Sequence, residues 1–343
     1  MIYDFSMGNM IFFEMDEWEN DYIKKALETY SPQFYKETLT KNNVTQFVDA
    51  TIISSMVYST LTKEVLSQLP NLKLIATRTT GFDHIDLAYC KEKNIAVCNV
   101  PSYGEVTVAE HTFALLLALS RNIVTSIERT RRGNFSLDGL EGFDLNGKTM
   151  GVIGAGHIGK RVIEIARCFG MQVIVYAHHK DEELAKDPKI QFVIDLDLLL
   201  SRSDVVTLHI PGSPENNHMI NLDNIKKFKT GSILLNTARG SLVDTQAIVY
   251  GLEKGILRGA GLDVLEEECG VKEEREILSD EFLKTCDIKT QLLNHVLLDC
   301  DNVIITPHNA FHSHEALLTI LDTTVGNIRG LLDGKIVNSV SAT

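Results

Sequence analysis

The sequence predicts an α/β fold with two domains, and three observations support this prediction. The chain has 343 residues, enough to build two hydrophobic cores. Short apolar strands alternate with helical patterns in two separate stretches, as in parallel sheets covered by helices. A glycine-rich loop at residues 154–159 follows the first strand of the second stretch and opens a helix. The second stretch therefore predicts a doubly wound parallel sheet that binds a dinucleotide.

The first stretch runs from about residue 10 to residue 100. Four apolar or β-branched runs in it are interpreted as strands, at 11–13, 50–54, 74–77 and 96–100. Helical patterns at 18–30 and 61–69 lie between them. These elements are typical of a smaller α/β domain.

The second stretch is denser and predicts a sheet of six strands. The strands are expected at 149–154, 172–176, 205–209, 232–236, 259–263 and 302–306. Residues 103–132 join the two stretches with apolar residues at helical spacing, which predicts one long helix. The tail is expected to be helical through residue 332.

Composition excludes several classes of function. With 33 Lys and Arg against 46 Asp and Glu, the net charge is −13, so neither a nucleic acid nor an anionic membrane is an expected partner. No apolar run reaches the 18 to 20 residues that a membrane span needs. The six cysteines show neither CxxC spacing nor a metal-binding pattern, which predicts free thiols in the cytoplasm.

The glycine loop carries the most specific local signal. Gly154 permits a tight turn, Gly156 lets the backbone approach a pyrophosphate, and Gly159 allows close helix–strand packing. The free N–H groups at the start of the helix expected at 158–169 would hold the anion. The alternative is a glycine-rich turn without a ligand.

One expected residue is missing after the second strand of this unit. An acidic side chain there normally holds the ribose 2′-OH of NAD, but Ala177 occupies the position. His178, His179 and Lys180 follow it. These basic side chains either accept the 2′-phosphate of NADP or form a solvated turn, so the sequence indicates NAD with NADP as the alternative.

Several motifs in a fixed order resemble the D-isomer-specific 2-hydroxyacid dehydrogenases, with the D-lactate dehydrogenase branch the most similar. The motifs are RTTGFDHID at 78–86, NVPSY at 99–103, AEH at 109–111, GAGHIG at 154–159, LHIPG at 208–212, LNTARG at 235–240, GLDV at 261–264 and TPH at 306–308. The resemblance implies a discontinuous, flavodoxin-like substrate-binding domain at 1–102 and 312–343. It implies a Rossmann-like dinucleotide-binding domain at 103–311, an active site in the interdomain cleft, and a homodimer formed through residues 103–132.

Three residues are the candidate catalytic group. Arg239 follows a predicted strand, where ligands bind in such sheets, and its planar fork matches a carboxylate. His308 follows the last strand and can donate a proton near neutral pH. The resemblance adds Glu268 as the carboxylate that raises the pKa of His308. The alternatives are a surface arginine for Arg239, a structural histidine for His308 and a solvated acidic run for Glu268. A metal site at His308, His312 and His314 is not expected, because no fourth ligand is evident.

The resemblance also implies roles for other residues. Thr80 and Gly81 would bind the substrate carboxylate through backbone N–H groups, and Tyr103 and Phe311 would face the substrate. Asp263 would hold the nicotinamide carboxamide. The remaining implied cofactor contacts are His157, Ile158, Ile210, Pro211, Asn216, Thr237 and Ala238.

The expected activity is NAD(P)H-dependent reduction of a small 2-oxo acid, with pyruvate first, to the D-2-hydroxy acid. Other substrates in the same class are glyoxylate, hydroxypyruvate and branched 2-oxo acids. A nucleotide-sensing corepressor, which binds the cofactor without turnover, is the alternative from a different class.

Overall fold

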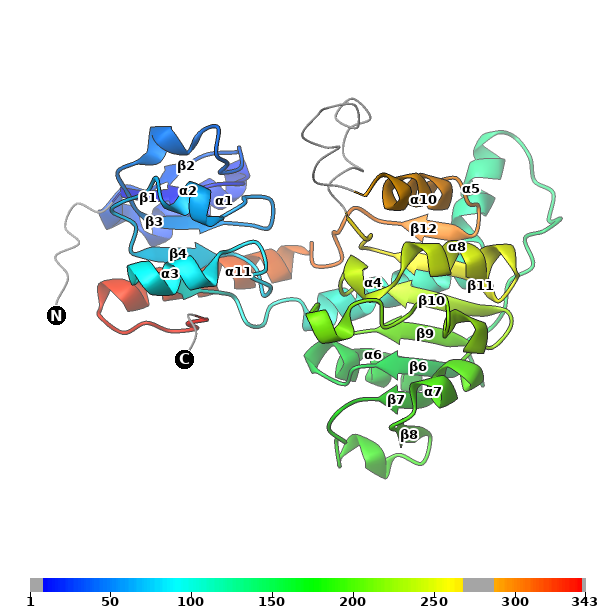
Figure 1. The fold of residues 1–343 in the computed structure, drawn as a ribbon. Coiled ribbons are helices and arrows are strands. Elements are labelled where there is room, and N and C mark those ends of the chain that lie inside the picture. Colours follow the sequence, from blue (N-terminus) through cyan, green and yellow to red (C-terminus); the bar gives the residue numbers. More distant parts are fainter. Residues whose placement is uncertain (1–8, 268–286, 341–343) are drawn as a thin grey trace. The chain divides into compact units, whose positions relative to one another are not determined.

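The computed structural model describes residues 9–267 and 287–340, which form two compact units (Figure 1). Unit 1 comprises residues 1–103 and 313–343, and unit 2 comprises residues 104–312. The chain therefore passes from one unit to the other twice, after residues 103 and 312. The sequence placed these boundaries after residues 102 and 311. Both units are parallel sheets covered by helices, and the predicted two-domain α/β class is confirmed.

In the described part of unit 1, five parallel strands lie in the order β2-β1-β3-β4-β5. This is the flavodoxin-like order. Its elements are β1 (Asn9–Phe12), α1 (Glu17–Ala26), β2 (Gln33–Phe34), β3 (Ala50–Ser55), α2 (Lys63–Leu66), β4 (Leu74–Thr77), α3 (Leu87–Lys93), β5 (Ala96–Cys98) and α11 (His314–Leu332), with 3-10 turns at Glu28–Tyr30 and Val44–Phe47. Strand β2 was not predicted, because two residues carry no period.

In the described part of unit 2, seven parallel strands lie in the order β12-β11-β10-β9-β6-β7-β8. The order reverses at β6, as in a doubly wound sheet. Its elements are α4 (Glu105–Ser120), α5 (Ile123–Arg131), β6 (Thr149–Ile153), α6 (His157–Cys168), β7 (Gln172–Tyr176), β8 (Ile190–Val193), α7 (Leu196–Arg202), β9 (Val205–Leu208), β10 (Ser232–Asn236), α8 (Thr245–Glu253), β11 (Leu257–Leu262), α10 (Ile288–Leu298) and β12 (Val303–Ile305). Four 3-10 turns complete it, at Leu184–Lys186, Pro214–Asn216, Ile225–Lys227 and Gly240–Leu242.

Two predictions about this unit were wrong. The sheet has a seventh strand, β8, an edge strand with two of its four residues buried. The single helix expected at 103–132 is two helices, because Asn122 adopts the left-handed conformation with φ of 51°. Asparagine tolerates that conformation better than most residues, but a hydrophobic period does not register such a break.

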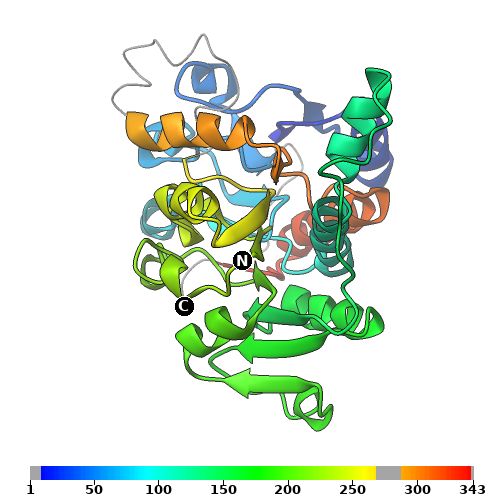
Figure 2. The same ribbon diagram turned by 90° about the vertical axis from the view of Figure 1, so that its right-hand side faces the viewer.

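Helices cover both faces of the unit 2 sheet, and each face has its own core. Helices α8 and α10 lie side by side on one face, where both views show them as neighbours (Figure 2). Helices α4 and α6 pack together on the other face. Buried strand residues alternate between the two cores, as a sheet covered on both faces requires. None of the helices in the described residues is both long and apolar enough to cross a membrane.

Candidate active site

The carboxyl ends of six neighbouring strands in unit 2 lie in one row. The register pairs Tyr176 with Ile153, Ile153 with Leu208, Leu208 with Asn236, Asn236 with Leu262, and Leu262 with Ile305. The loops that follow these residues therefore emerge at the same edge of the sheet. Ala177, Gly154, Thr237 and Asp263 come one residue after the row, and Arg239 and His308 come three residues after it.

The glycine loop fits the pyrophosphate of a dinucleotide. Gly154 has φ of 96°, and a Cβ there would collide with the backbone oxygen of His209. A Cβ at Gly159 would collide with the backbone oxygen of Gly154, whereas at Gly156 nothing lies within 4 Å. Gly156 also precedes α6 without a side-chain cap, so the N–H groups at the helix start are open to a ligand. The loop is thus tightly packed at Gly154 and Gly159 and open at Gly156, where a pyrophosphate would approach.

His157, the first residue of α6, is 84% exposed and its Nδ1 lies 3.5 Å from Oε1 of Glu105. Behind the loop, His209 has a buried Nδ1 without a hydrogen-bond partner, and its Nε2 lies 2.8 Å from Oγ1 of Thr207. Burial lowers the pKa of His209 to about 3. Sequence reasoning did not single out this histidine. Of the other implied contacts, Ile210 is half-buried, Pro211 is exposed, and Asn216 Nδ2 donates to the Pro211 oxygen at 3.0 Å.

The loop after β10 holds Arg239 in place through its own hydrogen bonds. Asn236 donates from Nδ2 to the Arg239 oxygen at 2.8 Å and accepts from the Ala238 N–H at 3.1 Å. Arg239 is half-buried, and its Nη1 donates to the Ala238 oxygen at 2.7 Å. A Cβ at Gly240 would collide with the backbone of Leu265, so the loops after β10 and β11 are in close contact.

The loop that carries His308 is fastened to Asp263, which is 1% exposed. Oδ1 of Asp263 accepts from Oγ1 of Thr306 at 2.5 Å and from the Asn309 N–H at 3.0 Å. Oδ2 accepts from the Ala310 N–H at 2.9 Å, and the Asp263 backbone oxygen accepts from the His308 N–H at 2.9 Å. His308 itself has φ of 53°. Asp263 therefore fixes the backbone of the histidine loop, a role that the sequence did not reveal.

Glu268 lies outside the described residues; of the two glutamates before it, Glu266 is half-buried and Glu267 is exposed, and both accept hydrogen bonds. Glu266 pairs with His218 and accepts from the N–H of Thr245, the first residue of α8, at 3.1 Å. Glu267 accepts from the Asp287 N–H at 2.6 Å, just before α10. Both glutamates thus anchor helices that follow the strand-end loops.

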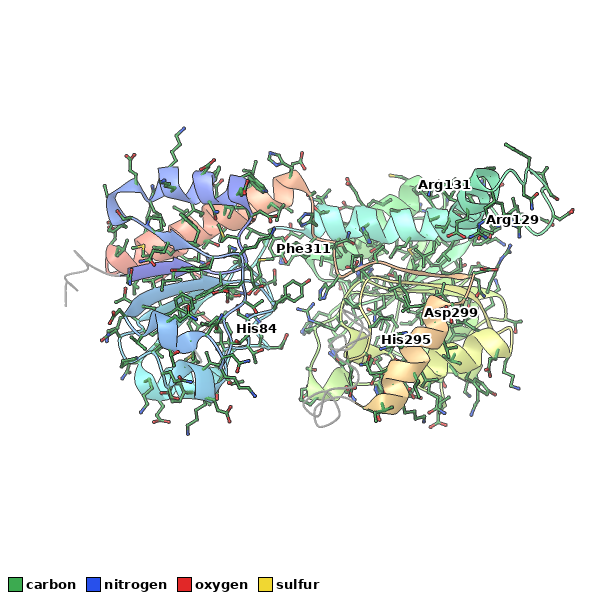
Figure 3. The ribbon with its side chains drawn as sticks, turned by 90° about the horizontal axis from the view of Figure 1, so that it is seen from above. His84, Arg129, Arg131, His295, Asp299 and Phe311 are labelled. Carbon is green, nitrogen blue, oxygen red and sulfur yellow. The ribbon has the colours of Figure 1, made fainter. Side chains whose placement is uncertain are left out.

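Four implied substrate residues fall in different parts of the chain. In unit 1, Thr80 donates to the Val100 oxygen at 2.9 Å, and the Gly81 oxygen accepts from Oγ1 of Thr79 at 2.6 Å. These hydrogen bonds shape the turn after β4, where both residues stand. Tyr103 is half-buried and ends the first part of unit 1. In unit 2, Phe311, which is labelled in Figure 3, comes three residues after His308.

The turn after β7 carries acidic residues as well as the basic residues noted in the sequence. Ala177 packs against the α4–α6 core, and the exposed Lys180 lies 3.5 Å from Glu182. Asp181, which sequence reasoning passed over, is 2.6 Å from Nζ of Lys160 on α6. That lysine lowers the pKa of Asp181. The turn therefore presents charges of both signs beyond its neutral first residue.

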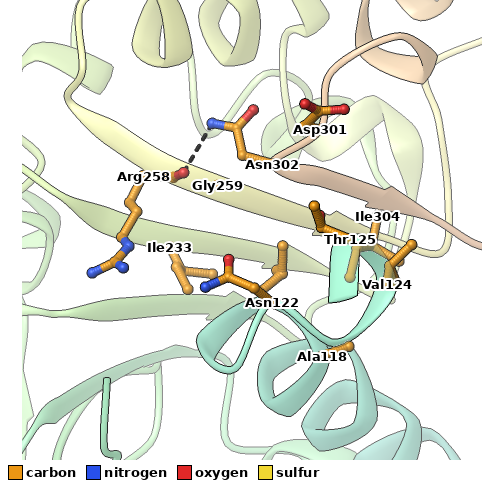
Figure 4. A pocket seen from close by; sticks show the side chains of 11 residues that line it. Ala118, Asn122, Val124, Thr125, Ile233, Arg258, Gly259, Asp301, Asn302 and Ile304 are labelled. Carbon is orange, nitrogen blue, oxygen red and sulfur yellow. Dashed lines mark hydrogen bonds between the residues drawn. The ribbon is translucent and has the colours of Figure 1, made fainter. Parts of the chain in front are cut away.

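A pocket at another part of unit 2 is too small for a dinucleotide. It encloses about 40 Å³ between the end of α4, α5 and strands β10 to β12 (Figure 4). Asn302 at its rim donates to the Arg258 oxygen at 2.9 Å. Among residues 9–267 and 287–340, no three His, Cys, Asp or Glu side chains form a group that could hold a metal ion.

Comparison with known proteins decides the family. Residues 113–310 match the family described as D-isomer specific 2-hydroxyacid dehydrogenase, NAD binding domain. The chain belongs to this family. It is therefore an NAD-binding oxidoreductase that acts on CH–OH groups, as the motif order predicted.

Individual relatives of this dehydrogenase align along nearly its whole length. A 2-hydroxyacid dehydrogenase homolog of Haemophilus influenzae is 35% identical over 338 residues, covering 96% of this chain and 97% of that protein. The D-lactate dehydrogenase of Escherichia coli is 33% identical, covering 94% and 96%. The structure of an Aquifex aeolicus D-lactate dehydrogenase complexed with NAD and lactic acid has a TM-score of 0.83 and 38% identity, covering 98% and 100%.

Proposed function

We propose that this dehydrogenase reduces a small 2-oxo acid, with pyruvate as the first candidate, to the D-2-hydroxy acid. The observation that carries the proposal is the shared strand-end edge, where the loops after β10 and β12 present Arg239 and His308 on either side of β11. A 2-oxo acid needs a cation for its carboxylate and a proton donor for its oxo oxygen. Both groups stand on loops that hydrogen bonds hold in place.

Each residue has one task in this proposal. The guanidinium of Arg239 binds and orients the substrate carboxylate, and the imidazolium of His308 donates a proton to the oxo oxygen. Glu268 is the proposed partner that favours the imidazolium. Thr80 and Gly81 of unit 1, the proposed substrate-binding domain, contribute backbone N–H groups to the carboxylate, and Tyr103 and Phe311 line the substrate's side chain.

The glycine loop holds the cofactor, with His157 and Ile158 at the start of α6. Further contacts to the cofactor along the same edge are proposed for Ile210, Pro211, Asn216, Thr237 and Ala238. When bound, reduced NAD supplies the hydride for the substrate carbon. The nicotinamide contact of Asp263 remains a prediction, since both carboxylate oxygens already accept hydrogen bonds from the histidine loop.

Oxidation of NADH, followed at steady state, tests the proposal. Pyruvate, glyoxylate, hydroxypyruvate, a branched 2-oxo acid and an aromatic 2-oxo acid are compared, and the chirality of each product is determined. We expect the highest kcat/KM for pyruvate and a D product. If another acid gives the highest kcat/KM, that acid replaces pyruvate as the proposed substrate. NADH binding without turnover of any acid supports a nucleotide-sensing binding protein instead.

We also propose a cytoplasmic homodimer that forms through residues 103–132, and we extend the contact to the segment that follows α5. Apolar side chains are exposed there, with Ile123 and Ile127 each 45% exposed, Phe135 78% and Leu137 82%. Arg129 and Arg131 lie towards the end of the same helix (Figure 3). Light scattering should give twice the monomer mass for the wild type, and Phe135→Asp with Leu137→Asp should give monomers. A monomeric wild type contradicts the proposal.

A further inference from the structure

Consecutive residues on helix α4 contact the two loops that carry the proposed catalytic groups. Nε2 of His111 lies 3.0 Å from Oγ1 of Thr306, in the loop of His308. Oγ1 of Thr112 lies 3.0 Å from Oγ1 of Thr237, in the loop of Arg239. We propose that His111 and Thr112 are positioning residues that set the placement of His308 and Arg239 at the edge of the sheet. The inference rests on the proposed function, which gives those two residues their roles.

The directions of the hydrogen bonds at His111 follow from counting protons. The Thr306 hydroxyl has one proton, which it donates to the buried carboxylate of Asp263 at 2.5 Å. Its oxygen can therefore only accept from His111, so Nε2 of His111 must carry a proton. The same Nε2 atom lies 3.5 Å from Oδ1 of Asp263. The imidazole, with 22% of its side chain exposed, thus donates into the network that fastens the histidine loop.

The same reasoning applies to Thr112, which is fully buried. Its hydroxyl donates to the Val108 oxygen at 2.8 Å, one turn back along α4. The proton between the two threonines must therefore come from Thr237, which is 8% exposed. Asn236 already forms hydrogen bonds within this loop. The hydrogen bond from the Thr237 hydroxyl to Thr112 therefore joins the loop to α4.

The His308 loop needs this support because its backbone is strained. A histidine with φ of 53° lies in the left-handed region, which is unfavourable for a residue with a side chain, and persists only when its surroundings determine it. Asp263 supplies the acceptors, but it is itself a loop residue one position beyond β11. His111 adds a donor from a helix of 16 residues, which is the more rigid base. Losing that donor would leave Thr306 held from one side and the carboxylate of Asp263 with fewer partners.

Paired substitutions separate positioning from simple packing. His111→Leu keeps much of the volume and removes the donor, whereas His111→Gln keeps an N–H donor. Thr112→Val removes the hydroxyl at constant shape, and Thr112→Ser keeps it. Glu110→Gln is the control, because Glu110 is an exposed residue of the same helix. Each kcat is expressed per NADH site, counted by fluorescence titration, so that misfolded protein does not enter the value.

We expect His111→Leu to lower kcat about 10- to 100-fold while the Kd of NADH stays within about twofold, because proton donation suffers and cofactor binding does not. His111→Gln should recover kcat to within about threefold of the wild type. Thr112→Val should raise the KM of the 2-oxo acid about fivefold or more, because it affects the Arg239 loop, and Thr112→Ser should recover it.

Equal kcat values per NADH site for His111→Leu and His111→Gln would overturn the role of His111. Equal KM values for Thr112→Val and Thr112→Ser would overturn the role of Thr112. Failure of the proposed function looks different: wild type and Glu110→Gln would both bind NADH yet reduce none of the 2-oxo acids. Thermal unfolding of each variant is measured alongside, and a loss of kcat that follows the melting temperature across all four variants contradicts positioning.

Discussion

The loop after β12 and the turn after β7 leave the same edge of the same sheet, yet they are built differently. The His308 loop donates four hydrogen bonds to one buried aspartate, Asp263, and has a further contact with α4. The turn at 177–181 is held by Lys160 and Asp181, both charged residues at the surface. A position fixed by several buried hydrogen bonds should be sensitive to small changes, whereas an exposed turn should tolerate substitution and adapt its specificity.

The largest effect is expected at the centre of the well-held loop. His308→Gln should lower kcat for reduction by at least about 100-fold, because glutamine cannot act as the general acid. The Kd of NADH, measured by fluorescence, should change little. An activity loss below about tenfold would show that another group supplies the proton.

The next test removes the charge of Asp263, which holds the His308 loop, and leaves His308 unchanged. Asp263→Asn puts an N–H₂ group where the carboxylate accepts from Thr306, Asn309 and Ala310, so a donor would face a donor. We expect the free energy of unfolding to fall by about 1 to 3 kcal/mol. Urea denaturation measures this, with Asp223→Asn, an exposed residue, as the control. Equal losses in the two variants would mean that the loop does not depend on the carboxylate.

Arg239→Lys tests the neighbouring loop after β10. Lysine keeps the charge but loses the planar fork, so we expect kcat to fall and the KM of pyruvate to rise, for a combined loss of about tenfold to 100-fold in kcat/KM. Steady-state kinetics with pyruvate measure both constants. Wild-type values would indicate that charge alone suffices or that another residue binds the carboxylate.

The smallest effect is expected at the exposed turn. With Ala177 in place we expect kcat/KM for NADPH within about tenfold of that for NADH, a difference of roughly 1.4 kcal/mol or less. Ala177→Asp should produce a clear NADH preference, mainly by repelling the 2′-phosphate. Asp181 is already acidic, but its ion pair with Lys160 offsets its charge.

Measurements at low and high salt show whether the basic side chains after Ala177 contribute, because screening weakens their attraction. A thousandfold preference for NADH in the wild type would contradict this view of the turn.

The sequence predicted much of this edge because strand ends and glycine spacing leave local signals. Gly154 and Gly159 are recognisable because a side chain at either would collide with backbone. The contacts of Asp263 and His111 with the His308 loop were not predictable, since they join residues 43 and 195 positions apart from Thr306. The left-handed Asn122 and the short strand β2 also escaped, because neither alters a hydrophobic period. Patterns along the chain thus predicted which candidate groups stand at this edge, and only the fold showed the hydrogen bonds that hold their loops.

The half-buried His209, whose Nδ1 is buried, has a consequence for the exchange of protons with solvent. With its pKa lowered to about 3, this imidazole is neutral throughout the physiological pH range. We therefore expect it neither to take up nor to release a proton when a dinucleotide binds at the glycine loop. In calorimetric terms, its contribution to the heat of cofactor binding is independent of the ionisation enthalpy of the buffer. In the proposed reduction, the proton that reaches the product therefore comes from His308 and not from His209.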